Sequence, residues 1–165
     1  MLALTLIPVA RFGPRYVLLL RGDREWSDIA MMKDSQLAGS QLRQAAGATK
    51  PGLLVWGYRP DIFVYSGFPA ATRFLDSQPL NGVIADRHLG DSKVSAPEIA
   101  AANRRQIAGQ APAFIVDGLG PYNPDLAIDR YFELKGYRVL ARNPGSIVYE
   151  RLPAPPDGAA LIEKR

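Results

Sequence analysis

Leu53–Trp56 (LLVW) is a continuous apolar run that begins after Pro51-Gly52 and ends before Gly57. A short apolar run between turn-forming residues predicts a buried strand. Because every position is apolar, rather than every second one, both faces of this strand should be covered, as in parallel sheets. Ala113–Val116 (AFIV) repeats the pattern and ends before Asp117-Gly118. Two such strands favour a sheet with further layers on both faces.

Helical patterns alternate with these strands. Asp34–Ala46 has one apolar face and is followed by Gly47, which suits a helix C-terminus. Pro60–Ser66 favours a short helix because proline suits the first helical position, although Ile62–Tyr65 (IFVY) is equally typical of a strand. Further helices are expected over Pro97–Gly109 and from Asn123-Pro124-Asp125 to a cap at Gly136.

Two strands near the C-terminus predict a hairpin. Tyr137–Arg142 and Ile147–Arg151 are joined by Asn143-Pro144-Gly145-Ser146, so they should run antiparallel. A further short strand is expected over Thr72–Asp76, and a loop over Ser77–Pro97. The alternation of helices and strands predicts an α/β fold: a three-layer, mostly parallel sheet flanked by helices, with a C-terminal antiparallel hairpin.

The length of 165 residues suits one domain, which we place at residues 21–152. Pro153–Arg165 is proline-led and charged, and is expected to be a flexible tail. Met1–Leu20 is an apolar segment, but Arg11 and Arg15 interrupt it before the roughly 20 apolar residues that a membrane span needs. Two interpretations remain open for it: a buried strand or helix, or the end of a transmembrane helix whose beginning is missing.

Composition excludes several classes of function. The chain has no cysteine, so disulfides, thiolate nucleophiles and zinc–thiolate sites are excluded. The net charge of +4 comes from basic residues that are spread along the chain rather than clustered. We therefore expect a solvated basic surface and no nucleic-acid partner.

Candidate binding residues follow the two apolar strands, because ligands of open α/β sheets sit beyond the carboxyl ends of the strands. We predict ligand binding by Tyr58, Arg59, Arg73 and Asp117. Either arginine is suited to an anion such as a phosphate or carboxylate, and the alternative is surface ion pairs. Asp117 with Asp61 would make an acid–base pair, and the alternative is turn formation by Asp117 and helix capping by Asp61.

No other motif carries chemistry. The only histidine, His88, has no nucleophile or acid motif around it and is expected to be a surface residue. Glycine-rich nucleotide loops and metal-ligand spacings do not occur, so we predict no catalytic residue, no metal and no cofactor. Aromatic residues that could stack on a sugar are Trp26, Trp56, Tyr58 and Tyr65, of which Trp56 fits the core better.

Val55–Leu75 (VWGYRPDIFVYSGFPAATRFL) resembles the soluble C-terminal region of bacterial polytopic membrane glycosyltransferases. These are relatives of the dolichyl-phosphate-mannose-protein mannosyltransferases and the lipid A aminoarabinose transferases. Further similarities are Trp26-Ser27-Asp28, the strand Phe114–Asp117 and the closing Ile147–Arg151. The resemblance covers roughly residues 10–152.

The resemblance implies an accessory, non-catalytic, extracytoplasmic (periplasmic) domain of an enzyme that uses a polyprenyl-phosphate-linked sugar. Its partner would be the membrane-embedded helical portion of the parent protein, and Met1–Leu20 would be the end of the last span. The family's catalytic acids lie in an early loop between spans, so none is carried over to this chain. The alternative is a self-standing α/β module that binds or acts on a small anionic ligand such as a sugar phosphate or nucleotide.

Overall fold

The computed structural model describes residues 27–84, 94–153 and 158–164, together with residues 9, 10, 13, 14, 16, 17 and 20. It divides into two compact units, Met1–Lys33 and Asp34–Arg165. The fold below belongs to the second unit, apart from the start of the first long helix. Most of Met1–Leu20, together with Trp26 and His88, lies outside the described residues. Within the described part of the chain, no helix combines the length and apolar character that crossing a membrane requires.

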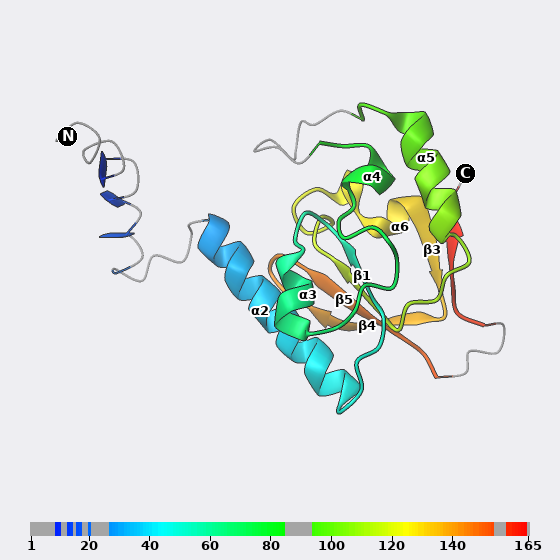
Figure 1. The fold of residues 1–165 in the computed structure, drawn as a ribbon, viewed down its shortest axis with the longest axis horizontal. Coiled ribbons are helices and arrows are strands. Elements are labelled where there is room, and N and C mark those ends of the chain that lie inside the picture. Colours follow the sequence, from blue (N-terminus) through cyan, green and yellow to red (C-terminus); the bar gives the residue numbers. More distant parts are fainter. Residues whose placement is uncertain are drawn as a thin grey trace. The chain divides into compact units, whose positions relative to one another are not determined.

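The main sheet has four strands in the order β1-β2-β5-β4 (Figure 1). β1 (Leu53–Trp56) and β2 (Phe114–Asp117) are parallel, with Trp56 opposite Asp117. β5 (Ile147–Arg151) is antiparallel both to β2 and to β4 (Tyr137–Arg142). The expected hairpin is therefore confirmed. The expectation of a mostly parallel sheet is wrong, because the sheet is mixed and two of its three strand pairings are antiparallel.

The reason lies in the connections. Only β1 and β2 are joined by a long crossover, which contains α5 (Pro97–Ile107). Between β2 and β4 the chain forms a short 3-10 turn, η1 (Pro124–Leu126), a one-turn helix, α6 (Ile128–Tyr131), and a strand, β3 (Phe132–Lys135), that belongs to a separate sheet. A parallel neighbour for β2 would need a crossover of a dozen or more residues that returns to the main sheet. The β4–β5 hairpin fills the place beside β2 instead.

Both faces of the sheet are covered, as the continuous apolar runs predict. Leu53 and Val55 face one core cluster, which receives Ala38 and Leu42 from α2 (Ser27–Ala46) and Ile62 from α3 (Asp61–Ser66). The other two residues of β1, Leu54 and Trp56, face the opposite cluster. That cluster is closed by residues of α4 (Gln78–Asn81), α5, α6, β3 (Phe132–Lys135) and β6 (Ala160–Glu163).

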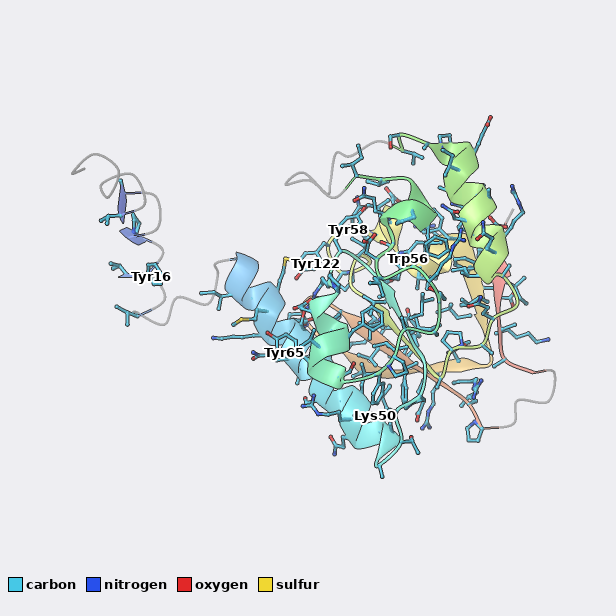
Figure 2. All side chains as sticks on the ribbon, in the orientation of Figure 1. Tyr16, Lys50, Trp56, Tyr58, Tyr65 and Tyr122 are labelled. Carbon is cyan, nitrogen blue, oxygen red and sulfur yellow. The ribbon has the colours of Figure 1, made fainter. Side chains whose placement is uncertain are left out.

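Two glycines shape the helix pair α2 and α3: one ends α3, and the other lets the two helices approach each other. α3 ends at Gly67, whose φ of 69° is left-handed and whose N–H donates to the carbonyl of Phe63 at 2.8 Å. The helical interpretation of Pro60–Ser66 is thereby confirmed. In α2, a Cβ added at Gly39 would lie 2.7 Å from the Cβ of Tyr65 (Figure 2). Only glycine at position 39 lets α2 and α3 approach so closely.

Four local expectations differ from the structure. The helix expected from Asn123 breaks at Ala127, whose ψ of 146° is extended, and the chain continues as β3. β3 pairs with β6, so the C-terminal segment expected to be flexible contains a strand instead. Thr72–Asp76 forms no strand, because the Thr72 hydroxyl accepts the N–H of Phe74 at 3.1 Å and bends the chain locally. The loop expected over Ser77–Pro97 contains α4.

Candidate functional site

Arg59 is 2 % exposed, and its guanidinium joins three segments of the fold. Nη1 donates to Oδ2 of Asp34 and to the carbonyl of Gly145, at 2.8 Å each. Nε and Nη2 donate to the hydroxyl of Ser35 at 3.1 and 2.6 Å. The Asp34 carboxylate also accepts the N–H of Gly145 at 2.9 Å. Arg59 therefore ties α2 to the β1–α3 turn and to the turn of the β4–β5 hairpin.

Tyr122 lies beside this tie (Figure 2). A Cβ added at Gly145 would collide with the Tyr122 hydroxyl and would lie 3.3 Å from the carboxyl carbon of Asp34. Partial burial raises the pKa of Tyr122, and the charge of Arg59 opposes that rise. A glycine at position 145 is therefore required for the hairpin turn to reach the buried ion pair.

Tyr58 precedes Arg59 and is half-buried. Its hydroxyl donates to the carbonyl of Val83 at 2.6 Å and accepts from the side-chain amide of Asn81 at 3.4 Å. Tyr58 therefore connects the β1–α3 turn to the end of α4 (Figure 2).

Arg73 lies in the loop after α3 and is exposed, with its guanidinium carbon 4.9 Å from the centre of the Phe74 ring. Asp61 lies in the first turn of α3, where an acid complements the helix dipole. Asp61, Arg73 and the Tyr58 hydroxyl thus each have a local role. Ligand binding by Tyr58, Arg59, Arg73 and Asp117 stays a prediction.

Asp117 ends β2 and is 1 % exposed. Its Oδ1 accepts the N–H groups of Leu119 and Gly120, both at 2.9 Å, and its Oδ2 accepts the N–H of Ile128 at 3.0 Å. Burial raises the pKa of Asp117, and the three N–H donors oppose part of that rise. The side chain organises the turn after β2, as the turn interpretation of this residue predicts.

Asp117 also lines a cavity of about 230 Å³ at the carboxyl end of β2, which we call the Asp117 hollow. This is the edge of the sheet at which the sequence predicts ligand binding. Of the four predicted residues, Asp117 is the one that lines the hollow. The lining residues are Asp117, Gly120, Pro124, Ala127, Asp129, Arg130, Ile147, Tyr149 and Lys164.

The two cationic side chains of the hollow donate to backbone carbonyls. The ammonium of Lys164 donates to the carbonyl of Asp129, and Nε of Arg130 donates to the carbonyl of Pro124 at 3.3 Å. Burial raises the pKa of Tyr149 to about 12, and the carboxylates of Asp117 and Asp129 add to the rise. Two carboxylates, two cations and a protonated phenol therefore surround one small space.

Sequence reasoning did not find Asp129, Arg130, Tyr149 or Lys164. Lys164 follows β6, in the segment expected to be a flexible tail, and the partner strand β3 was expected to be helical. The one signal was the hairpin, because an antiparallel β5 beside β2 places Ile147 opposite Asp117. Tyr149, two residues further along β5, then lies on the same face of the sheet as Ile147.

A larger cavity of about 520 Å³ lies at the other end of β1 and β2. Its lining is rich in alanine and proline, and its charged residues include Arg138 and Glu150, which form an ion pair at 2.7 Å. Arg151 in the same lining donates to the carbonyl of Ala111 at 2.7 Å. Arg138 and Glu150 pair with each other, and the cavity lies away from the carboxyl ends of β1 and β2, where ligands of such sheets bind, so it is the weaker candidate for a polar ligand. Among the described residues, no group of acidic or histidine side chains is arranged to hold a metal ion.

Replacement of Asp117 by asparagine should change how stability depends on pH. Because the pKa of Asp117 is raised in the folded state, the folded protein binds this proton more tightly than the unfolded chain does. The contribution of that proton is therefore fully present below the ordinary aspartate value of 3.8 and is lost as the pH rises through the folded pKa. We expect the free energy of unfolding of the wild type, relative to Asp117→Asn, to fall as the pH rises above about 4. Urea unfolding of both proteins at a series of pH values measures this, and a difference that stays constant or grows with pH contradicts it.

No family model matches the chain, and comparisons with curated proteins and with solved structures found no match. The functional interpretation therefore depends on the residues and the geometry described above.

Proposed function

We propose that this chain is an accessory, non-catalytic domain of a membrane glycosyltransferase that uses a polyprenyl-phosphate-linked sugar. The domain rests on the extracytoplasmic, periplasmic face, against the membrane-embedded helical portion of its parent protein. There it covers the mouth of the active site or helps to hold the carrier or the acceptor.

The observation that carries this proposal is the structural use of the segment that resembles these transferases. Trp56 is fully buried, and its indole N–H donates to the carbonyl of Leu126 at 2.8 Å. A Cβ added at Gly57 would lie 3.3 Å from the backbone of Gly118, and Arg59 forms the buried tie to Asp34. Residues used in this way identify a fold rather than a chemistry, as expected of an accessory domain.

The alternative is a self-standing module for a small anionic ligand, and the Asp117 hollow is where such a ligand would sit. Arg130 and Lys164 supply two positive charges to the lining. Asp117 and Asp129 supply two negative charges to the same lining, so the hollow offers no net attraction to an anion. The accessory role is therefore the better supported of the two.

Cell fractionation tests the proposal. We expect the full chain, expressed from Met1, to sediment with membranes and to need detergent for extraction, because Met1–Leu20 would insert at the lipid surface. A matched variant in which three leucines of this segment, Leu18, Leu19 and Leu20, are replaced by serine should move to the aqueous fraction. A wild-type chain that remains monomeric in the aqueous fraction without detergent contradicts the proposal. An open frame upstream of Met1 that encodes hydrophobic spans would support it independently.

A further inference from the structure

The Asp117 hollow brings together polar groups from three parts of the fold. Asp129 and Arg130 come from α6, Tyr149 comes from β5, and Lys164 follows β6. We propose, resting on the function above for the source of the ligand, that this hollow binds one neutral, hydroxyl-rich ring, the size of a single monosaccharide. In the parent enzyme that ring would belong to the sugar of the carrier or of the acceptor.

The hollow supplies acceptors for hydroxyl groups. Asp129 is exposed and lines the hollow, and its carboxylate is close enough to Asp117 and Tyr149 to raise the pKa of both. A hydroxyl that donates to a carboxylate makes a charge-assisted hydrogen bond, roughly twice as strong as a neutral one. The Asp117 carboxylate already accepts three N–H groups, so it lines the hollow without serving as an acceptor for the ligand.

The hollow also supplies hydrogen-bond donors. The N–H of Lys164 donates to the carbonyl of Tyr131 at 2.8 Å, and its ammonium donates to the carbonyl of Asp129. The ammonium keeps further protons for a ligand, since it has three donors. Arg130 is anchored through Nε at Pro124, and its Nη2 lies 3.9 Å from Asp125. Tyr149 lines the hollow as well, and its phenol carries a proton at neutral pH and so is a further donor.

Apolar groups line the same space. Pro124, Ala127 and Ile147 offer carbon surface, and Tyr149 offers the edge or face of its ring. A ring that carries hydroxyls on its rim and C–H groups on its faces matches this mixture of polar and apolar lining. Gly120 keeps the space next to Asp117 open, because a Cβ at this position would lie 2.7 Å from Oδ2 of Asp117.

Size and charge exclude other ligand classes. Pockets for drug-sized ligands occupy about 300–1,000 Å³. The volume of about 230 Å³ is therefore too small for a whole nucleotide but adequate for one ring. A free phosphate would meet the carboxylates of Asp117 and Asp129 as well as the cations, so it gains little from the hollow. A neutral polyol uses the acceptors and the donors at once.

Titration of the ¹⁵N-labelled full chain, extracted in a detergent that carries no sugar, tests this inference by NMR. The probes are glucose, mannose, galactose and N-acetylglucosamine, with inorganic phosphate as the comparison ligand. We expect at least one sugar to shift the amide signals of Gly120, Asp129 and Tyr149 saturably, with an affinity of about 1–10 mM. Asp129→Asn should weaken that binding about tenfold, because the amide oxygen of asparagine accepts only a neutral hydrogen bond in place of the charge-assisted one. Tyr149→Phe should weaken it by a smaller factor, since the ring remains.

The matched control is Glu98→Gln, which removes an exposed acid from the first turn of α5, away from the hollow, and should bind like the wild type. The inference is overturned if none of the four sugars shifts these signals. It is equally overturned if phosphate shifts them and the sugars do not, or if Asp129→Asn binds as tightly as the wild type. Because this titration needs no membrane and no parent enzyme, its failure would leave the fractionation result, and hence the proposed function, unaffected.

Discussion

Replacing Arg59 by methionine is expected to lower the free energy of unfolding by about 3–5 kcal/mol. The Arg59 side chain is 2 % exposed and that of Asp34 is 5 % exposed, so the variant leaves a carboxylate buried without its cation. The carbonyl of Gly145 and the hydroxyl of Ser35 lose donors at the same time. Methionine keeps most of the length of the arginine stem, so the loss reflects the charge and the hydrogen bonds rather than a large cavity. Urea unfolding followed by circular dichroism measures the change.

Arg138→Met is the matched control. Arg138 pairs with Glu150 at 2.7 Å, a distance close to the 2.8 Å between Arg59 and Asp34, but its side chain is 60 % exposed. An exposed ion pair contributes about 0–1 kcal/mol, so this variant should unfold at nearly the urea concentration of the wild type. The comparison isolates burial as the cause. Equal losses in the two variants would show that the tie around Arg59 does not carry the stability that its geometry implies.

The tie at Arg59 also shows why the site was harder to predict than the strands. An arginine next to a turn is usually solvated, and nothing adjacent in the sequence marks this one as buried. Its partner Asp34 lies 25 positions earlier, and Gly145 lies 86 positions later. Such contacts depend on how α2 and the hairpin pack, and neither periodicity nor turn chemistry contains that information.

The sequence predicted those elements whose ends are set by turn residues next to them in the chain. β1 begins after Pro51-Gly52 and ends before Gly57, and α3 ends at Gly67, as the turn residues indicate. The β4–β5 hairpin follows in the same way from Asn143–Ser146. Each of these boundaries depends on backbone conformations that only a few neighbouring residues determine.

Strand pairing joins segments that are far apart in the sequence, and the predictions that depended on it were wrong. Phe132–Lys135 fits a helix as well as a strand, because Ile128, Tyr131 and Leu134 also recur at helical spacing. What decides for a strand is its partner β6, where Glu163 lies opposite Phe132. The position of β5 beside β2, which makes the sheet mixed, likewise depends on residues that are far apart in the sequence. For this reason the sequence predicted Asp117 but not Tyr149 or the other charged residues of the Asp117 hollow, since their placement needs both pairings to be correct.

Replacing Trp56 by alanine should lower the free energy of unfolding by about 3–5 kcal/mol. The Trp56 side chain is fully buried, and its ring lies 5.1 Å from the ring of Tyr131 and 5.9 Å from that of Phe132. Alanine would leave a cavity between β1 and these residues, and it would leave the carbonyl of Leu126 without its indole donor. Because Trp56 is the last residue of β1, the loss should also loosen the turn that carries Tyr58. Thermal unfolding followed by circular dichroism measures the first effect.

Val64→Ala is the control for this variant. Val64 lies on α3 and is 80 % exposed, so removing its methyl groups should change the free energy of unfolding by no more than about 0.5 kcal/mol. Trp56→Phe separates the two causes, because phenylalanine refills most of the cavity but has no N–H group. If packing dominates, Trp56→Phe should recover more than half of the stability that Trp56→Ala loses. If it recovers almost none, the hydrogen bond to Leu126 is the main contribution of Trp56, and the core on this face of the sheet tolerates a cavity.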